Sequence, residues 1–280
     1  MKMRIGQIGA ALTILLALSL QLGCEKSPQE IKLRMQFVKD RELAYDLASE
    51  QIISIDSPDF SADTSRTKGE MIQTVTEVLT DGSARVKEAS YWSWAEPDED
   101  GAVKVVSRDE TLSYLMDATG KVSDLEILSE DDAAMWKEYA QSKLEQSQPT
   151  FPEEPVGLGY TWMQSVKIFM PDGEMLDAAT TYEVTEFVEI DGRKCAIIDY
   201  TGNLVLPFNV VETDSTIRKG VDKVDVTGTI WFDYVGGYVF SQHEKTMITA
   251  ERARIFPTEA TSYTAYIEGD LFFNLKADEQ

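Results

Sequence analysis

Apolar and polar residues alternate along most of this chain, and this alternation is the feature that most limits its fold. Ile31, Leu33 and Met35 are separated by polar residues, which is the period of two expected for a strand with one buried face. Two longer runs, MIQTVTEVL and ARVKEASYW, flank an Asp81-Gly82 pair, a strong signal for a β-hairpin. The pattern predicts a mainly β protein built from antiparallel sheets.

The strand pattern occurs twice along the chain. Four residues recur in the same order 109 to 116 positions later. Tyr45 corresponds to Tyr160, Thr76 to Thr185, Asp81 to Asp191, and Gly120 to Gly236. Asp-Gly turns alone are common in antiparallel proteins, but four landmarks in constant order favour a tandem duplication. We therefore predict two related β-rich halves, residues 30–128 and 149–280.

One helix is predicted between the halves, over residues 129–148. Trp136, Tyr139, Ala140 and Leu144 form an apolar stripe at helical spacing, and Pro149 ends the segment. The helix would connect the last strand of the first half with the first strand of the second half.

The first 23 residues have the layout of an export signal. Lys2 and Arg4 precede an apolar run over residues 8–22, which is shorter than the ~20 residues that a helix needs to span a bilayer. The run ends at Gly23-Cys24. This stretch resembles the lipobox of bacterial lipoproteins, in which cleavage precedes a cysteine that carries diacylglycerol. Gln21 departs from that pattern, which usually has leucine there, and an ordinary secretory signal is the alternative.

The lipobox resemblance implies a lipid on Cys24, residues 24–29 as a short tether, and attachment to a membrane of the bacterial envelope. Glu25 stands where an aspartate would resemble a retention signal for the inner membrane, so the periplasmic face of the outer membrane is favoured over the cytoplasmic membrane. Cys195 is the only other cysteine. It would have no disulfide partner, and we expect it to be a small buried residue in a strand.

The net charge of −23 limits the partners of this chain. Without Lys2 and Arg4, the exported part has 24 basic and 49 acidic residues, a net charge of −25. Such a surface repels nucleic acid and anionic lipid headgroups. We therefore predict no nucleic-acid partner, and contact with the membrane only through the lipid.

Residue types that carry out catalysis are scarce. His243 is the only histidine, which excludes a multi-histidine zinc site and disfavours a Ser-His-Asp arrangement. Its neighbour Glu244 lies on the opposite face of a strand. Asp98 and Asp100 lack the further ligands of a calcium-binding loop. We predict no catalytic residue, no metal and no cofactor.

Two apolar stretches fall at matching places in the two halves, SYWSWAEPDEDG and GNLVLPFNVVETD. Pro207 breaks the second run, which suits a loop or a sheet edge rather than a central strand. One interpretation is that both stretches pack over open ends of the sheets. The other is a ligand-binding apolar groove, and its residues would be Trp92, Trp94, Leu204, Leu206 and Phe208.

The lipobox, the FPEEPVGLGYTW segment and the repeated strand-Asp-Gly-strand units resemble an uncharacterised family of bacterial envelope lipoproteins with a duplicated β-rich body. The layout is also loosely similar to lipoprotein-carrier half-barrels, curved sheets that hold acyl chains against a helix. These resemblances imply a non-enzymatic binding module for an apolar small molecule, such as a lipid, or for an envelope protein. A hydrolase of envelope glycans that uses acidic residues, and a structural spacer, are the alternatives.

Overall fold

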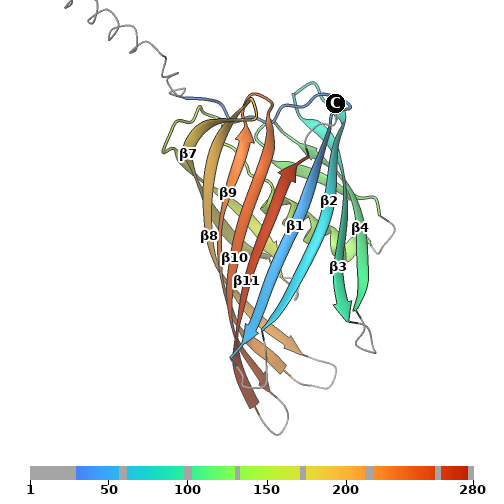
Figure 1. Ribbon diagram of the computed structural model, residues 1–280, viewed down its shortest axis with the longest axis vertical. Coiled ribbons are helices and arrows are strands. Elements are labelled where there is room, and N and C mark those ends of the chain that lie inside the picture. The colour runs from blue at the N-terminus through green and yellow to red at the C-terminus, as the bar shows by residue number, and fades with distance from the viewer. Residues whose placement is uncertain are drawn as a thin grey trace, which may run out of the picture.

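A computed structural model describes residues 30–56, 62–97, 103–129, 133–170, 175–211, 217–255 and 260–276. In this part of the chain eleven strands form one antiparallel sheet, with one helix against it (Figure 1). Along the sheet the strand order is β5-β4-β3-β2-β1-β11-β10-β9-β8-β7-β6. The strands are β1 Glu42–Ile55, β2 Asp63–Val78, β3 Ala84–Pro97, β4 Val103–Met116, β5 Val122–Ile127, β6 Thr161–Phe169, β7 Met175–Ile190, β8 Arg193–Val211, β9 Ile217–Asp233, β10 Tyr238–Ile255 and β11 Ala260–Leu275. The prediction of a mainly β, antiparallel protein with one connecting helix is confirmed.

Strand β11 lies in the middle of the sheet, between β1 and β10. Residues 260–269 and 270–275 form this single strand. Gly269, at their boundary, continues the ladder and pairs with Gln51 and Thr246. Because β1 pairs with β11, the two halves share one sheet, while the duplication itself stays a prediction.

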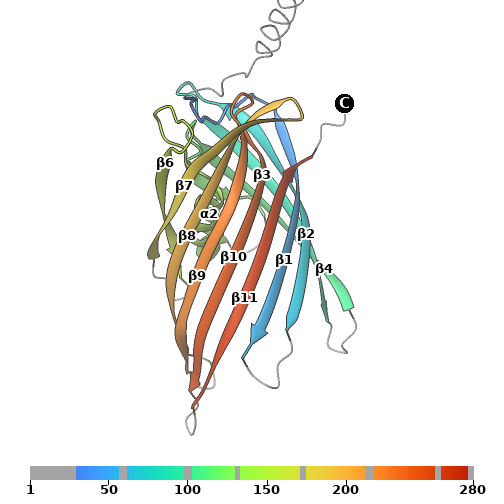
Figure 2. The same cartoon turned by 60° about the vertical axis from the view of Figure 1, so that its left-hand side comes forward.

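Helix α2 (Ala133–Ser147) lies on the inner side of the curved sheet and contacts both edge strands, β5 and β6 (Figure 2). The buried Ser142 side chain fixes it to β6, since its Oγ donates to the Lys167 carbonyl oxygen at 2.8 Å and accepts from the Phe169 N–H at 3.1 Å. Gln164 Nε2 donates to the Glu145 and Gln148 carbonyl oxygens at 3.1 Å each. The sheet therefore forms a trough whose two edges meet the same helix. No helix among the described residues is long and apolar enough to cross a membrane.

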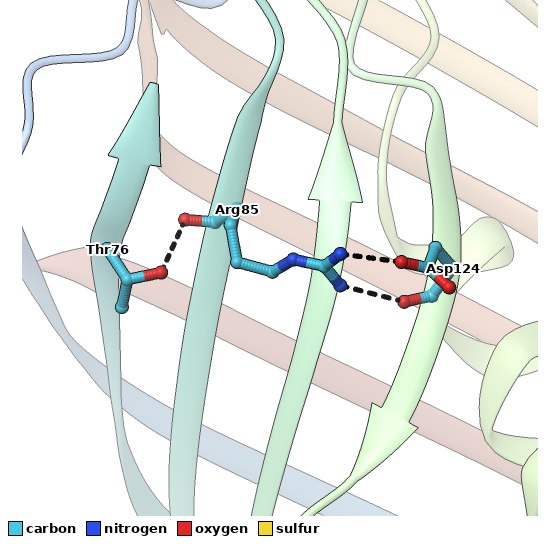
Figure 3. A network of polar contacts seen from close by, with 3 residues as sticks. All are labelled: Thr76, Arg85 and Asp124. Atoms are coloured by element: carbon cyan, nitrogen blue, oxygen red, sulfur yellow. Dashed lines mark hydrogen bonds and ion pairs between the residues drawn. The ribbon is translucent and has the colours of Figure 1, made fainter. Parts of the chain in front are cut away.

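The short edge strand β5 is held by a polar network on the outer surface (Figure 3). Arg85 on β3 extends across β4, and its two terminal nitrogens donate to the carbonyl and the side-chain Oδ2 of Asp124 at 3.2 and 2.6 Å. Thr76 on β2 donates to the Arg85 carbonyl oxygen at 3.1 Å. The pair is exposed, so its Coulomb contribution is small, and its main effect is to fix the position of β5.

The Asp-Gly turns occur where the sequence predicts them. Gly82 (φ +86°) joins β2 to β3, and Gly192 (φ +76°) joins β7 to β8. Both lie in the left-handed region, which glycine adopts without a steric cost. These turns lie at the same end of the trough as the segments 30–41 and 149–160.

That end of the trough is packed. Ile31 and Val156 form a two-residue bridge, and Leu33, Phe151 and Phe232 are buried together with Val156 in one core cluster. Cys195 is fully buried in β8, as predicted, and burial raises the pKa of its thiol to about 11. The trough is thus filled at the end where the described chain begins.

Candidate functional site: a cavity in the trough

The rest of the trough encloses a cavity of about 1330 Å³. Residues from all eleven strands and from α2 line it. On β8 the lining includes the alternate residues Tyr200, Gly202, Leu204 and Leu206, together with Asn203. The period of two in the sequence therefore selects most of the β8 residues that face inward. Most side chains in the lining are apolar or aromatic. This volume exceeds the ~300–1000 Å³ of ordinary small-molecule pockets.

The predicted groove residues Trp92, Trp94, Leu204 and Leu206 all line this cavity. They lie within β3 and β8, not in loops. Phe208 also falls in β8, opposite Gly220, but its side chain is outside the described part of the structure.

Pro207 is accommodated because this part of β8 is locally a sheet edge. β7 pairs with β8 only as far as Gly202, and beyond that residue β8 is registered with β9 alone. A proline there removes no ladder hydrogen bond on the open side. The preference for an edge was therefore sound, and the long β9 explains why an edge segment can still be a strand.

Trp92 lies flat against the wall because its neighbour on β2 is a glycine. Trp92 and Gly69 are direct cross-strand partners, and Gly69 is paired in turn with Leu47 on β1. A Cβ at Gly69 would lie 2.9 Å from Trp92 Cε3 and 2.5 Å from the Tyr91 carbonyl oxygen. The indole packs instead against the cluster that contains Leu47. The ring thus covers β2 rather than filling the cavity.

Tyr200 has the same arrangement on the other side of the trough. Tyr200, Gly228 and Glu244 are in direct register on β8, β9 and β10. A Cβ at Gly228 would lie 2.3 Å from Tyr200 Cζ and 2.6 Å from the His243 carbonyl oxygen. The phenol crosses over the glycine, and its hydroxyl donates to Glu244 Oε2 at 2.9 Å. Two strand glycines therefore keep two large rings along the walls.

Sequence reasoning missed these glycines and the polar residues of the lining. A glycine inside an alternating strand pattern signals close approach of another group, so Gly69 and Gly228 could have been found. Nothing in a single sequence shows that Tyr200 and Glu244 meet, because they are 44 residues apart.

Glu88 is another acidic residue of the lining, which also includes Glu244, Asp109 and Glu110. Its Oε2 accepts hydrogen bonds from Gln73 Nε2 at 3.0 Å and from the Tyr114 hydroxyl at 2.9 Å. Removal from water raises the pKa of the Glu88 carboxyl, and the nearby Glu110 raises it further, against the lowering effect of the two donors.

We expect Glu88→Gln to increase stability at neutral and higher pH. Glu88 binds its proton more tightly in the folded protein than in the unfolded chain, where its ordinary pKa is 4.5. Its stabilising contribution is therefore complete below that pKa and is lost as pH rises through the raised folded-state value. Thermal melts across pH should show a higher Tm for the variant, by about 2–4 °C for each kcal/mol, and the difference should vanish in acid.

The matched control is Glu183→Gln, a fully comparable change at an exposed position of β7. Its Tm difference from wild type should not depend on pH in this way. A Glu88→Gln protein that melts below wild type at every pH would show that the carboxylate itself stabilises the fold.

The other chemically reactive candidates do not face the cavity or are not described. His243 lies on the outer face, stacked on Phe272 at 4.4 Å and hydrogen-bonded to Asp270 at 3.0 Å. Cys24 and the Asp98 and Asp100 pair lie outside the described residues. Among the residues that are described, no three His, Cys, Asp or Glu side chains converge as metal ligands would.

No protein-family model matches the chain, and no curated protein matches it at a significant level.

Proposed function

We propose that this protein is a non-enzymatic, lipid-anchored carrier of the bacterial envelope that binds an apolar or amphiphilic small molecule in its trough. The observation that carries this proposal is the cavity of about 1330 Å³, with its mostly apolar lining drawn from every strand. Burial of apolar ligand surface supplies ~25 cal/mol per Å². A cavity of this size and lining is what an apolar ligand requires, whereas a structural spacer has no need of it.

The anchor belongs to the proposal through the lipobox resemblance at Cys24. Glu30, the first described residue, is joined to the packed end of the trough, where Ile31 bridges to Val156. The proposed tether of residues 24–29 spans at most ~20 Å. The packed end would then face the anchoring membrane, and the hollow end would point away from it.

An envelope-protein partner is the second candidate, and one observation favours it. β5 pairs only with the last part of β4, Leu112–Met116, so the preceding part of β4 forms the sheet edge. Val103 and Val105 there are each 76 % exposed. An edge of this kind can accept an added strand.

Native mass spectrometry on residues 27–280, exported without the lipid anchor, separates these two functions. The carrier proposal expects adducts of lipid mass that survive gentle desolvation and disappear when the protein is denatured. A bare mass from folded protein, together with no binding of the neutral apolar probe N-phenyl-1-naphthylamine, would contradict the carrier function and favour the partner-protein candidate.

A further inference from the structure

Four acidic residues line the cavity, and two of them, Glu88 and Glu244, lie on opposite sides of the central strand β11, while Asp109 and Glu110 lie on β4. Glu88 lies on β3, and Glu244 lies on β10. Each is oriented by a tyrosine hydroxyl, from Tyr114 at 2.9 Å and from Tyr200 at 2.9 Å. A glutamine completes each group, because Gln73 donates to Glu88 and Gln242 donates to Tyr200 at 3.0 Å. The arrangement fixes both carboxyl groups in a lining that is mostly apolar.

Neither carboxyl group has a cationic partner within the described ranges. The hydrogen bonds of Glu88 come from neutral donors, Gln73 and Tyr114, and those of Glu244 come from Tyr200 and Thr246, the latter at 3.3 Å. Three cations line the cavity, namely Arg41, Arg108 and Lys143, and Arg41 and Lys143 contact other groups. Arg41 donates to the Gly236 carbonyl oxygen at 3.1 Å, and Lys143 lies 5.1 Å from the centre of the Tyr139 ring.

Glu88 also keeps an oxygen available. Both of its hydrogen bonds end on Oε2. Oε1 takes part in neither of them, and Glu88 lines the cavity. A carboxylate oxygen can only accept hydrogen bonds, and a charged donor gives it the strongest ones.

We propose that the cavity selects amphiphiles whose polar end is a positively charged hydrogen-bond donor, such as a primary amine, over amphiphiles that end in a carboxylate. This inference rests on the proposed carrier function and names the ligand class for the same cavity. An ammonium group would supply the counter-charge that Glu88 and Glu244 do not find in the described chain. An anionic end would meet two acceptors of the same sign in surroundings that screen charge poorly.

The test compares two probes with the same twelve-carbon chain, dodecylamine and dodecanoate. Each is titrated below its micelle-forming concentration against protein loaded with N-phenyl-1-naphthylamine, at neutral pH and about 0.15 M salt, where surface charges are largely screened. Dodecylamine should displace the probe at a concentration at least about tenfold lower than dodecanoate, a difference of about 1.4 kcal/mol.

The matched variants are the inner pair Glu88→Gln with Glu244→Gln and the outer pair Glu183→Gln with Glu186→Gln. Both pairs remove two negative charges, but Glu183 and Glu186 are exposed on β7 and do not line the cavity. The inner pair should bring the ratio of the two displacement concentrations to within about twofold of one, and the outer pair should leave it at the wild-type value.

The possible results distinguish the carrier function, the selectivity for amines and the assignment of that selectivity to Glu88 and Glu244. If the probe binds but both amphiphiles displace it equally from wild type, the carrier function stands and the proposed selectivity is wrong. If the inner and outer pairs lower the ratio equally, overall charge explains the preference and the assignment to Glu88 and Glu244 fails. If the inner pair does not fold, judged by circular dichroism, Glu244→Gln alone replaces it and should lower the ratio at least about threefold. An unchanged ratio there also overturns the proposal.

Discussion

Gly228→Ala should lower the free energy of unfolding by about 2–3 kcal/mol, a large effect for one methyl group. The new Cβ would lie 2.3 Å from Tyr200 Cζ, so the phenol must leave the wall and enter the cavity. It would also lie 2.6 Å from the His243 carbonyl oxygen, a backbone atom that cannot move without disturbing the β9–β10 ladder. The hydrogen bond between Tyr200 and Glu244 would be lost as well. Urea denaturation measures the change.

Gly202→Ala is the control, because Gly202 also lies in a strand and lines the cavity. Its added Cβ would lie 3.4 Å from Thr180 Oγ1 and 3.5 Å from the Ala179 carbonyl oxygen, with no closer contact. The loss of backbone freedom in the unfolded chain should therefore make it neutral or stabilising by up to about 1 kcal/mol. In a Tyr200→Ala background, Gly228→Ala should cost less than in wild type. Equal costs in both backgrounds would show that the ring is not what the glycine accommodates.

Replacement of both Trp92 and Trp94 by alanine should weaken binding of N-phenyl-1-naphthylamine by about 100-fold, equivalent to about 2.7 kcal/mol. Both indoles line the cavity from the same face of β3. Each offers a large apolar surface to a ligand at a small cost in side-chain entropy. Fluorescence titration of the probe measures the affinity. The carrier proposal requires that the variant lose probe affinity while it stays folded.

Tyr91→Ala tests whether the tryptophans act through the cavity. Tyr91 is the residue before Trp92 on β3, so its side chain points to the opposite, outer face of the sheet, where it is 46 % exposed. Its removal should leave probe affinity within about twofold of wild type. Circular dichroism confirms that all variants fold. Unchanged affinity in the double tryptophan variant would show that these rings only cover the sheet.

Much of the fold could be predicted from local patterns, and what escaped prediction is long-range. The Asp-Gly turns at Gly82 and Gly192 reflect short-range chemistry, and the structure has those turns. The alternation that begins at Ile31 predicted a strand, but the structure has only an isolated bridge between Ile31 and Val156 there. The pairing of β1 with β11 depends on residues more than 200 positions apart, such as Tyr45 and Leu275. No local propensity encodes such a pairing, so one sheet could not be distinguished from two.

Part of the candidate site could also be predicted from local sequence patterns. Trp92, Trp94, Leu204 and Leu206 stood out as large apolar residues in unusual surroundings, and all four line the cavity. The second stretch was expected to suit a loop or a sheet edge because Pro207 looks like a break in a strand, and the structure makes it an edge segment of β8. β3 extends to Pro97, and β8 passes through Pro207 because its neighbour β7 has already ended there.

The central position of β11 also sets the order in which this protein can form. The pairing of β1 with β11 joins the first described strand to the last. Among the described strand pairs, these contacts have the longest sequence separation. Such contacts are slow to form because the loop entropy must be lost before they stabilise anything. Until the final strand arrives, β1 and β10 both present unpaired edges, which invite association between chains. For a chain exported as proposed, protection from aggregation would matter most just before the last strand emerges.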